Sequence, residues 1–280
     1  MSSFQELEFK NAVAPITAGV VVSAVLFGCA IVQTNSYYKS FPADSWLLKA
    51  LVVTEMLLQL VRTALLTTGI WQVAVVDYEQ SQLQVFIPTS LATVIILSAP
   101  IAFLVQATFS VLLYRLSRRP ILFTIHLFLT ASRFVLHIAI GVASYGTRNT
   151  GELVQQWYWC IVAILILSII CDTFVTASLT HRLKIQKIDS TQPSEVIDLI
   201  IVFTFATGLL TSAAELTTVV CLWALPGNCT WMSLWIAVSG LYTVSFLAAL
   251  NQRGHFCQLL PGHDCGCTNW TEGNAQGFKE

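Results

Sequence analysis

Seven long apolar runs, separated by short polar connections, limit what this chain of 280 residues can fold into. A helix needs about 20 mostly apolar residues to cross a hydrocarbon core about 30 Å thick, because each residue adds about 1.5 Å of rise. The runs that meet this requirement are residues 14–36, 46–72, 86–114, 120–143, 157–181, 196–225 and 231–250. The sequence therefore predicts an all-α integral membrane bundle of seven transmembrane helices.

The composition excludes an ordinary soluble domain. Charged residues make up only 10% of the chain and apolar residues 55%, whereas a soluble domain averages about 25% charged residues. So few charges cannot cover a water-facing surface. We therefore expect the lipid bilayer of the plasma membrane, or of another secretory-pathway membrane, to surround the chain. The net charge of −1 gives no reason to expect a nucleic-acid partner.

The distribution of Lys and Arg predicts the orientation, since cytoplasmic loops carry an excess of these residues. The connections after the first, third and fifth runs, together with the C-terminal tail, hold ten of them, and the opposite side holds two. The ten are Lys39, Lys49, Arg115, Arg118, Arg119, Arg182, Lys184, Lys187, Arg253 and Lys279, and the two are Lys10 and Arg148. We expect residues 1–13 outside the cell, residues 14–253 as the membrane domain, and residues 254–280 as a disordered cytoplasmic tail.

Tryptophans gather at the ends of the predicted helices, where amphipathic rings favour the interface between lipid and water. These residues are Trp46, Trp71, Trp157, Trp159 and Trp231. We expect them to form an interfacial belt rather than to pack in the core.

Several segments together resemble a known family. They are residues 26–33 (Leu-Phe-Gly-Cys-Ala-Ile-Val-Gln), Tyr37, Tyr38, Asp44, residues 114–119, Asp172, residues 207–212 (Thr-Gly-Leu-Leu-Thr-Ser), Leu241, Tyr242 and residues 250–253 (Leu-Asn-Gln-Arg). This combination resembles a large family of basidiomycete multi-pass membrane proteins described only as a domain of unknown function. The chain departs from the family at Ala206, where Asn is usual, and at Gln252, where Ala is usual. The resemblance implies a fungal origin and a shared fold, and it brings no known activity.

The known chemistries of seven-helix proteins do not fit this sequence. A retinal protein needs a Lys within its last helix, and none of the six lysines lies in a helix core. An intramembrane zinc hydrolase needs several inward His ligands, but only His126 and His137 lie within helices. No nucleophile–base pair, cofactor motif or metal cluster is visible. We therefore expect no catalytic residue, cofactor or metal, and we expect that the protein is not an enzyme.

Three cysteines are expected near the outer face, namely Cys160, Cys221 and Cys229. One disulfide could form among them, but connectivity cannot be deduced from sequence.

The main functional signal is a set of polar residues inside predicted helices: Glu55, Gln59, Arg62, Arg133, His137, Asp172 and Glu215. A charge at mid-membrane costs about 2.5–3.5 kcal/mol on insertion scales, so such residues usually face the bundle interior. Positions 55, 59 and 62 share one helical face, as do positions 133 and 137. These residues form a candidate intramembrane polar site, which is either a structural network or a site for a ligand or ion.

Counting residues from the helix ends places Arg62, Arg133 and Glu215 at one depth and Glu55 and Asp172 at a deeper one. Arg stays protonated, so an unpaired guanidinium in hydrocarbon is the costliest arrangement. We therefore expect Glu215 to pair with Arg62 or Arg133, which leaves the other Arg for an anionic ligand group or a backbone carbonyl. We expect Glu55 and Asp172 to share a proton or coordinate a cation.

One face of the sixth predicted helix carries small residues: Thr204, Gly208, Thr211 and Ser212. Small residues let helix backbones approach closely in lipid. We expect this face to pack against a neighbouring helix.

Topology, basic cytoplasmic loops and the absence of internal repeats favour a receptor-like or sensor-like membrane protein, with a small ligand and a cytoplasmic protein partner at the basic loops. The alternatives are a small-solute or proton-coupled transporter that uses the charged layer, and a non-catalytic membrane scaffold. A receptor should contain a cavity open to the outside, a transporter a polar path to both faces, and a scaffold a packed interior.

The predicted topology can be tested with tags at the two ends of the chain. A fluorescent or protease-sensitive tag after Glu280 should report from the cytoplasm, and one before Met1 should report from outside, because an odd number of spans separates them. Tags that report from the same side would contradict the count of seven.

Overall fold

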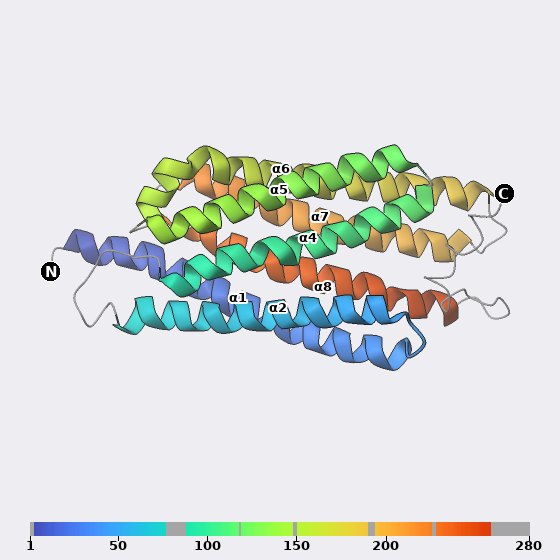
Figure 1. Cartoon of the computed structure of the whole chain (residues 1–280), viewed down its shortest axis with the longest axis horizontal. Coiled ribbons are helices and arrows are strands. Elements are labelled where there is room, and N and C mark those ends of the chain that lie inside the picture. The colour runs from blue at the N-terminus through green and yellow to red at the C-terminus, as the bar shows by residue number, and fades with distance from the viewer. Residues whose placement is uncertain are drawn as a thin grey trace.

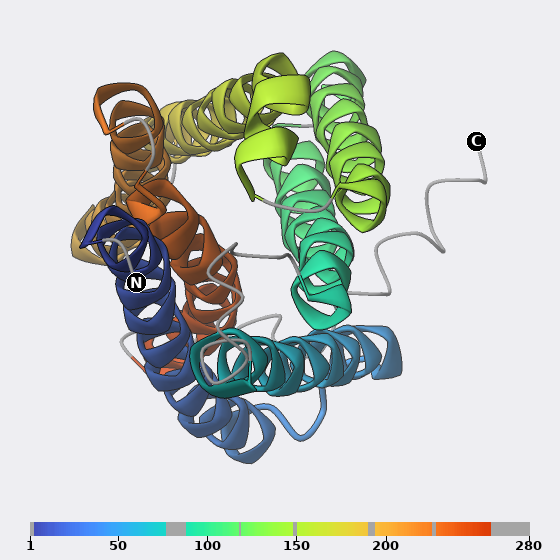
Figure 2. The ribbon, with the colours of Figure 1, turned by 90° about the vertical axis from the view of Figure 1, so that its left-hand side faces the viewer.

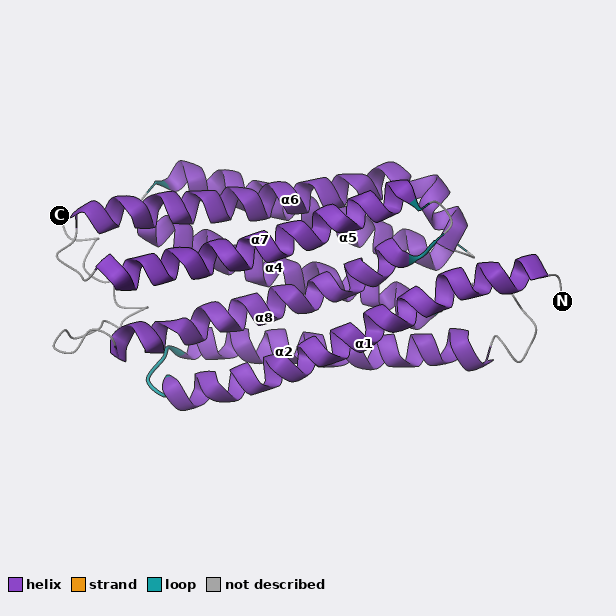
Figure 3. Cartoon of the chain, turned by 180° about the vertical axis from the view of Figure 1, so that it is seen from behind, coloured by secondary structure: helices purple, strands orange, loops and turns teal. Residues whose placement is uncertain are grey.

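The computed structural model describes residues 3–76, 88–117, 119–147, 150–189, 194–225 and 228–258, with side chains over 13–75, 88–115, 117, 119–147, 151–182, 184–185, 208–225 and 228–252. Every regular element in these ranges is helical (Figure 3). The elements are α1 Ser3–Ser40, α2 Trp46–Trp71, the π-helical turn η1 Gln72–Val76, α4 Thr89–Ser117, α5 Pro120–Gly146, α6 Thr150–Asp189, α7 Ser194–Ala224 and α8 Thr230–Gln258.

Each of the seven apolar runs coincides with one of these α-helices, which confirms the all-α fold. The helix ends differ from the ends of the runs, because a helix continues into polar sequence where nothing breaks it. Thus α1 begins at Ser3 and α8 continues to Gln258. Within α6, Trp157 has non-helical angles (φ −115°, ψ 18°), so a short helix precedes a kink at the residue where the apolar run begins. The remainder of the expected tail, 259–280, lies outside the described residues.

The helices lie side by side along one long axis (Figure 1). Seen from the end, they form a ring in which each helix packs against the next one along the chain (Figure 2). α8 packs against α1 and closes the ring, and α4 also contacts α6 and α8 across its interior. Side chains that face inward from the seven helices therefore meet in one interior.

Six of the helices are long and apolar enough to cross a membrane, namely α1, α2, α4, α5, α6 and α8. In α7 the side chains are described only from Gly208 onward, and this apolar stretch, Gly208–Ala224, is shorter than a full span. The chain is a multi-pass membrane protein.

Many polar side chains lie in the interior beside buried apolar clusters, and large apolar side chains cover the outside, unlike the surface of a soluble protein. Phe128 and Val135 on the outer face of α5 are 70% and 64% exposed. The buried stripe of α5 instead contains His126, Arg133 and His137. The buried stripe of α2 likewise contains polar residues. Its buried positions follow one another at alternating intervals of four and three residues. Lipid is the solvent that accommodates this distribution.

The described Lys and Arg side chains lie at one end of the bundle, apart from Arg62 and Arg133 in its interior. We call this the basic end; it holds Lys39, Lys49, Arg115, Arg119, Arg182 and Lys184. The opposite end, where α1 begins, is called the N-terminal end. At the basic end the hydroxyl of Tyr37 donates to Asp44 over 2.9 Å, and the amide of Asn251 donates to the carbonyl of Gln33 over 2.8 Å.

The tryptophans only partly follow the expected belt. Trp46, Trp71 and Trp159 are 75%, 64% and 80% exposed, as an interfacial position requires. Trp231 is only 4% exposed and stacks against Trp235, so the expectation was wrong for this residue. Trp231 lies on the inward face of the first turn of α8. A tryptophan near a helix end is exposed only if its side chain also faces outward.

Two glycines mark places where helices approach closely. A Cβ on Gly208 would lie 2.9 Å from the Cβ of Thr176 in α6, and a Cβ on Gly19 would lie 2.7 Å from the carbonyl oxygen of Ser233 in α8. The expected contact of the α7 small-residue face is thus confirmed at Gly208, and Thr211 is also buried. The side chain of Thr204 lies outside the described residues.

Replacing Gly208 by Leu should destabilise the bundle, because the new side chain would collide with Thr176. Overpacking of this kind costs about 1–3 kcal/mol. The melting temperature of the purified protein in detergent measures the effect. Ala213→Leu, on the exposed face of the same helix, is the matched control and should leave the melting temperature nearly unchanged. Equal melting temperatures for the two variants would contradict close packing at Gly208.

Candidate functional site

Arg62 lies on the buried stripe of α2 and is only 1% exposed. Its Nε donates to the hydroxyl of Ser98 over 3.1 Å, and its Nη1 donates to the hydroxyl of Ser23 over 3.1 Å. Its Nη2 donates to the carbonyl of Ile236 over 2.7 Å. The guanidinium thus connects α2 with α1, α4 and α8 through three neutral acceptors.

Arg133 has a different environment from Arg62. Its Nη2 lies 3.4 Å from Oε1 of Glu215 in α7, forming an ion pair between side chains that are 5% and 1% exposed. Its Nη1 donates to the hydroxyl of Tyr242 in α8 over 3.2 Å, and its Cζ lies 5.1 Å from the centre of that ring. Arg133 therefore has both an opposite charge and an aromatic partner.

Tyr242 connects the Arg133–Glu215 pair to a second acid. Its hydroxyl lies 2.7 Å from Oε1 of Glu215 and 3.0 Å from Oδ2 of Asp172 in α6. The amide of Gln106 in α4 donates to the other oxygen of Asp172. A hydroxyl carries one proton, so it can donate to only one carboxylate at a time. We call these five residues the Arg133 cluster; α4, α5, α6, α7 and α8 each contribute one.

Glu55 lies outside this cluster. Its Oε1 accepts a hydrogen bond from the hydroxyl of Thr243 over 2.9 Å, and its Oε2 has no hydrogen-bond partner in the described part of the chain. The amide of Gln59, one turn further along α2, is also unpartnered among the described residues. No hydrogen bond joins Glu55 to Asp172 in the described ranges, so the two acids do not share a proton there, and the expected coordination of a cation stays a prediction.

His137 lies on the same buried stripe of α5 as Arg133, which it follows by one turn. Its ring stacks on Trp235 with centroids 5.1 Å apart and an interplanar angle of 20°. His137 and Trp235 thus connect the surroundings of Arg62 with the Arg133 cluster.

The expected pairing of Glu215 with one of the two arginines is confirmed for Arg133. Arg62 is the arginine that does not pair with Glu215. It donates to a backbone carbonyl, which was one of the two alternatives expected for the unpaired arginine. The expected depth of Asp172 was wrong, because Tyr242 joins it to Glu215. Counting residues along straight helices ignores helix tilt, and the kink in α6 shifts the count further.

The neutral members of the site were not predicted from the sequence; they are Ser23, Ser98, Gln106, Tyr242 and Thr243. Gln106 could have been found, because it is the only amide or charged side chain between Thr89 and Tyr114. Hydroxyl residues are common in transmembrane helices and usually bond to their own backbone, so they carry no comparable signal.

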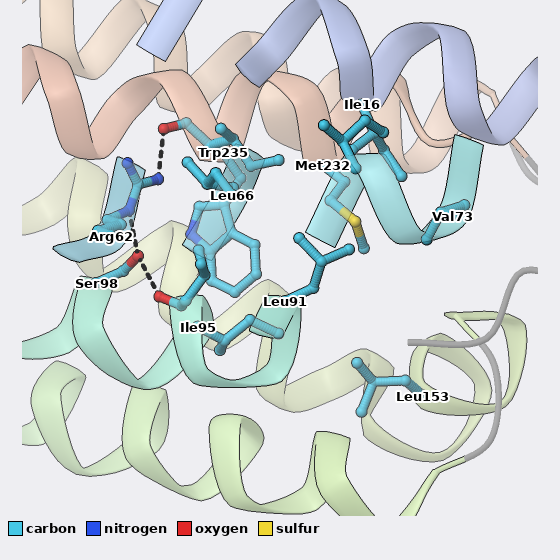
Figure 4. A pocket seen from close by; sticks show the side chains of 13 residues that line it. Ile16, Arg62, Leu66, Val73, Leu91, Ile95, Ser98, Leu153, Met232 and Trp235 are labelled. Atoms are coloured by element: carbon cyan, nitrogen blue, oxygen red, sulfur yellow. Dashed lines mark hydrogen bonds between the residues drawn. The ribbon is translucent and has the colours of Figure 1, made fainter. Parts of the chain in front are cut away.

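A cavity extends from Arg62 toward the N-terminal end of the bundle. We call it the Arg62 cavity. Figure 4 shows Arg62 and Ser98 at one side and Val73 and Leu153 at the other. Apart from Arg62 and Ser98, its lining is aliphatic, aromatic or thioether, contributed by α1, α2, η1, α4, α6 and α8.

A second cavity of about 380 Å³ lies on the other side of the Arg133 cluster. We call it the Asp172 cavity; Asp172, Gln106 and Tyr242 line it, together with residues of α4, α6, α7 and α8. On α8 its lining residues are Tyr242 and Ser245, whereas those of the Arg62 cavity are 232, 235 and 236. The two cavities are therefore separated along the axis of the bundle.

No disulfide forms among the three cysteines that were expected to offer one. Cys160, Cys221 and Cys229 are all free thiols. Burial raises the pKa of the Cys229 thiol to about 11, so it stays protonated at neutral pH. Within the described residues, no group of three or more His, Cys, Asp or Glu side chains is placed to hold a metal ion.

Comparison with known proteins relates part of the chain to a family. Residues 168–255, from the second half of α6 to the last turns of α8, match a family of unknown function (DUF6534). The segments at 207–212 and 250–253, as well as Asp172 and Tyr242, fall within this range. No curated protein and no solved structure matches the chain. The match agrees with the expected resemblance to a family of unknown function, and it assigns no activity to the site.

The ion pair in the Arg133 cluster can be tested by removing one partner and then both. Glu215→Leu should cost about 3–5 kcal/mol, because it leaves Arg133 without its paired charge. The double variant Arg133→Met with Glu215→Leu should recover much of that loss if the pair is purely structural. Thermal unfolding of Arg133→Met, Glu215→Leu and the double variant in detergent measures this, with Lys39→Gln on the exposed last turn of α1 as the control. A double variant whose loss equals the sum of the two single losses would contradict a direct pair.

Proposed function

We propose that this multi-pass membrane protein is receptor-like or sensor-like, and that it binds a small ligand in the Arg62 cavity. The observation that carries the proposal is a cavity whose lining is apolar except for one buried arginine and one serine. Binding sites for small molecules typically have mostly apolar linings and a few polar groups that fix orientation.

The proposal includes seven membrane spans, with the N-terminus outside and the C-terminus in the cytoplasm. The seven α-helices that cross the bundle support this count, together with the apolar sequence of residues 196–225. The basic end supports the orientation, because Lys and Arg favour the cytoplasmic side. In this orientation the Arg62 cavity lies in the outer half of the membrane, where a receptor would meet an external ligand.

The contacts of Trp235 suggest how an occupied cavity would affect the rest of the bundle. Trp235 lines the Arg62 cavity and stacks on His137. One turn along α5, Arg133 contacts Glu215 and Tyr242, which belong to α7 and α8. A ligand that moves the indole would therefore act on side chains that hold α5, α7 and α8 together.

A second candidate function is a proton-coupled or cation-coupled transporter. The observation that favours it is the Asp172 cavity, on the far side of the same polar cluster from the Arg62 cavity. The cluster brings one guanidinium together with two carboxylates. If both acids are ionised, one negative charge remains, which a proton or a monovalent cation would neutralise.

The remaining parts of the proposal concern the surroundings of the protein. We propose a plasma-membrane or other secretory-pathway location, and a non-enzymatic role without a cofactor. A cytoplasmic protein partner is proposed at the basic end. There a groove of about 810 Å³ is lined in part by Arg119, His181 and Arg182, which favours an acidic partner surface.

Filling the Arg62 cavity tests the proposed function. Dodecanoate and dodecanol are single-chain probes of its apolar wall, and at least one of them should raise the melting temperature of the wild-type protein in a saturable way. Leu91→Trp places an indole in the cavity and should abolish that rise. Leu57→Trp, at a position of α2 that is 55% exposed, is the matched control and should preserve it.

Two outcomes would count against the receptor-like function. If neither probe stabilises the wild-type protein, or if Leu91→Trp responds like Leu57→Trp, the cavity is not the binding site. Liposomes containing the protein separate the two candidates with dodecanol as the probe, because dodecanoate itself carries protons across a bilayer. A receptor should bind dodecanol without proton movement, whereas a proton-coupled transporter should acidify the lumen when dodecanol is added outside.

A further inference from the structure

We propose that the ligand of the Arg62 cavity is a single-chain amphiphile with an anionic head, and that Arg62 binds this head. The inference rests on the function proposed above and adds the chemical class of the ligand. The cavity offers an apolar wall for a hydrocarbon chain and one fixed positive charge for the head.

Among the described residues, no opposite charge compensates the charge of Arg62. Its three hydrogen bonds go to the hydroxyls of Ser23 and Ser98 and to the carbonyl of Ile236, all of which are neutral. A guanidinium carries five N–H donors and stays protonated. In the part of the chain that the structure describes, no carboxylate lies within ion-pair distance of it. A buried cation without an opposite charge is costly in a membrane interior.

Arg133 provides the internal comparison. It is buried in the same bundle, it has the carboxylate of Glu215 at 3.4 Å, and it does not line the Arg62 cavity. The described part of the chain thus supplies a counter-charge to the arginine away from the cavity and none to the arginine that lines it. A carboxylate or phosphate at Arg62 would supply that charge, and it can accept two parallel hydrogen bonds from a guanidinium.

The shape of the cavity determines the rest of the ligand. Leu66, Ile70 and Val73 follow Arg62 along α2 and η1, so the apolar wall extends roughly 15 Å toward the N-terminal end at about 1.5 Å per residue. A small inorganic anion would leave this wall empty, and a neutral hydrocarbon would leave the charge of Arg62 uncompensated. An anionic head on a hydrocarbon chain fills the apolar wall and also compensates the charge of Arg62.

The test compares probes that share one chain and differ only in the head group. The full chain in phosphatidylcholine nanodiscs is titrated with bromododecanoate, bromododecanol and bromododecyltrimethylammonium, whose bromine quenches nearby tryptophan. The difference between wild type and Trp235→Phe isolates the signal from the cavity, because Trp235 lines it. The carboxylate should bind about tenfold more tightly than the alcohol, and the ammonium most weakly.

Substitution of Arg62 assigns the preference to this residue. Arg62→Lys keeps the positive charge and should keep the order of the three probes. Arg62→Met removes the charge and should bring the carboxylate to or below the affinity of the alcohol. Arg119→Met, an exposed arginine at the basic end, is the matched control and should leave the order unchanged. Because Arg62→Met could fail to fold, the wild-type probe series is decisive by itself.

The outcomes separate this inference from the proposed function. Equal binding of the carboxylate and the alcohol, or a preference for the ammonium, would overturn the anionic head and leave the cavity as a binding site. Absence of quenching by all three probes would overturn both. Nanodiscs that contain phosphatidylglycerol distinguish two sources of the same chemistry: competition with bromododecanoate identifies a bilayer lipid, and its absence identifies a free amphiphile.

Discussion

The ion pair between Arg133 and Glu215 is the interaction on which the rest of the interior depends. It lies where lipid surrounds the helices and water is scarce, so each charged group needs a partner inside the protein. Tyr242 joins the pair to Asp172, and the complete cluster takes one side chain from each helix between α4 and α8. The register of five helices is therefore coupled at one level of the bundle. Displacement of any one helix along its axis would expose a charge or an unpaired polar group to hydrocarbon.

The helices and the inward-facing polar residues were predictable from the sequence, because both follow from the cost of polar groups in hydrocarbon. Length and apolarity identify each helix, and the spacing of Glu55, Gln59 and Arg62 identifies a buried face. The hydrogen-bond and ion-pair partners of these residues were predictable only where opposite charge alone determines them. Opposite charges at similar depth predicted a pair for Glu215, whereas the selection of Arg133 over Arg62 depends on how the helices are arranged around the interior, because α7 packs mainly against α6 and α8 rather than against α2 or α5.

The remaining features could not be predicted because they depend on three-dimensional packing. The hydroxyl of Tyr242 contributes through its position between two carboxylates, and nothing in the local sequence distinguishes it from other aromatic residues in a membrane helix. The Arg62 cavity is likewise formed by residues from six elements whose side chains do not fill the space between them. Patterns in the sequence specify which faces are buried, but they do not specify how completely those faces interlock.

The distribution of the Arg133 cluster along the chain has a consequence for biosynthesis. Arg133 and Glu215 are 82 residues apart, and at about 5–20 residues per second the ribosome needs roughly 4–16 s to add that length. During this interval α5 already carries its guanidinium, while its counter-charge has not yet been made. The nascent helix must stay in a hydrated or protein-lined environment until α7 arrives. Release of this protein into the bilayer is therefore expected to be late and collective, with α5 retained at the insertion machinery rather than delivered helix by helix.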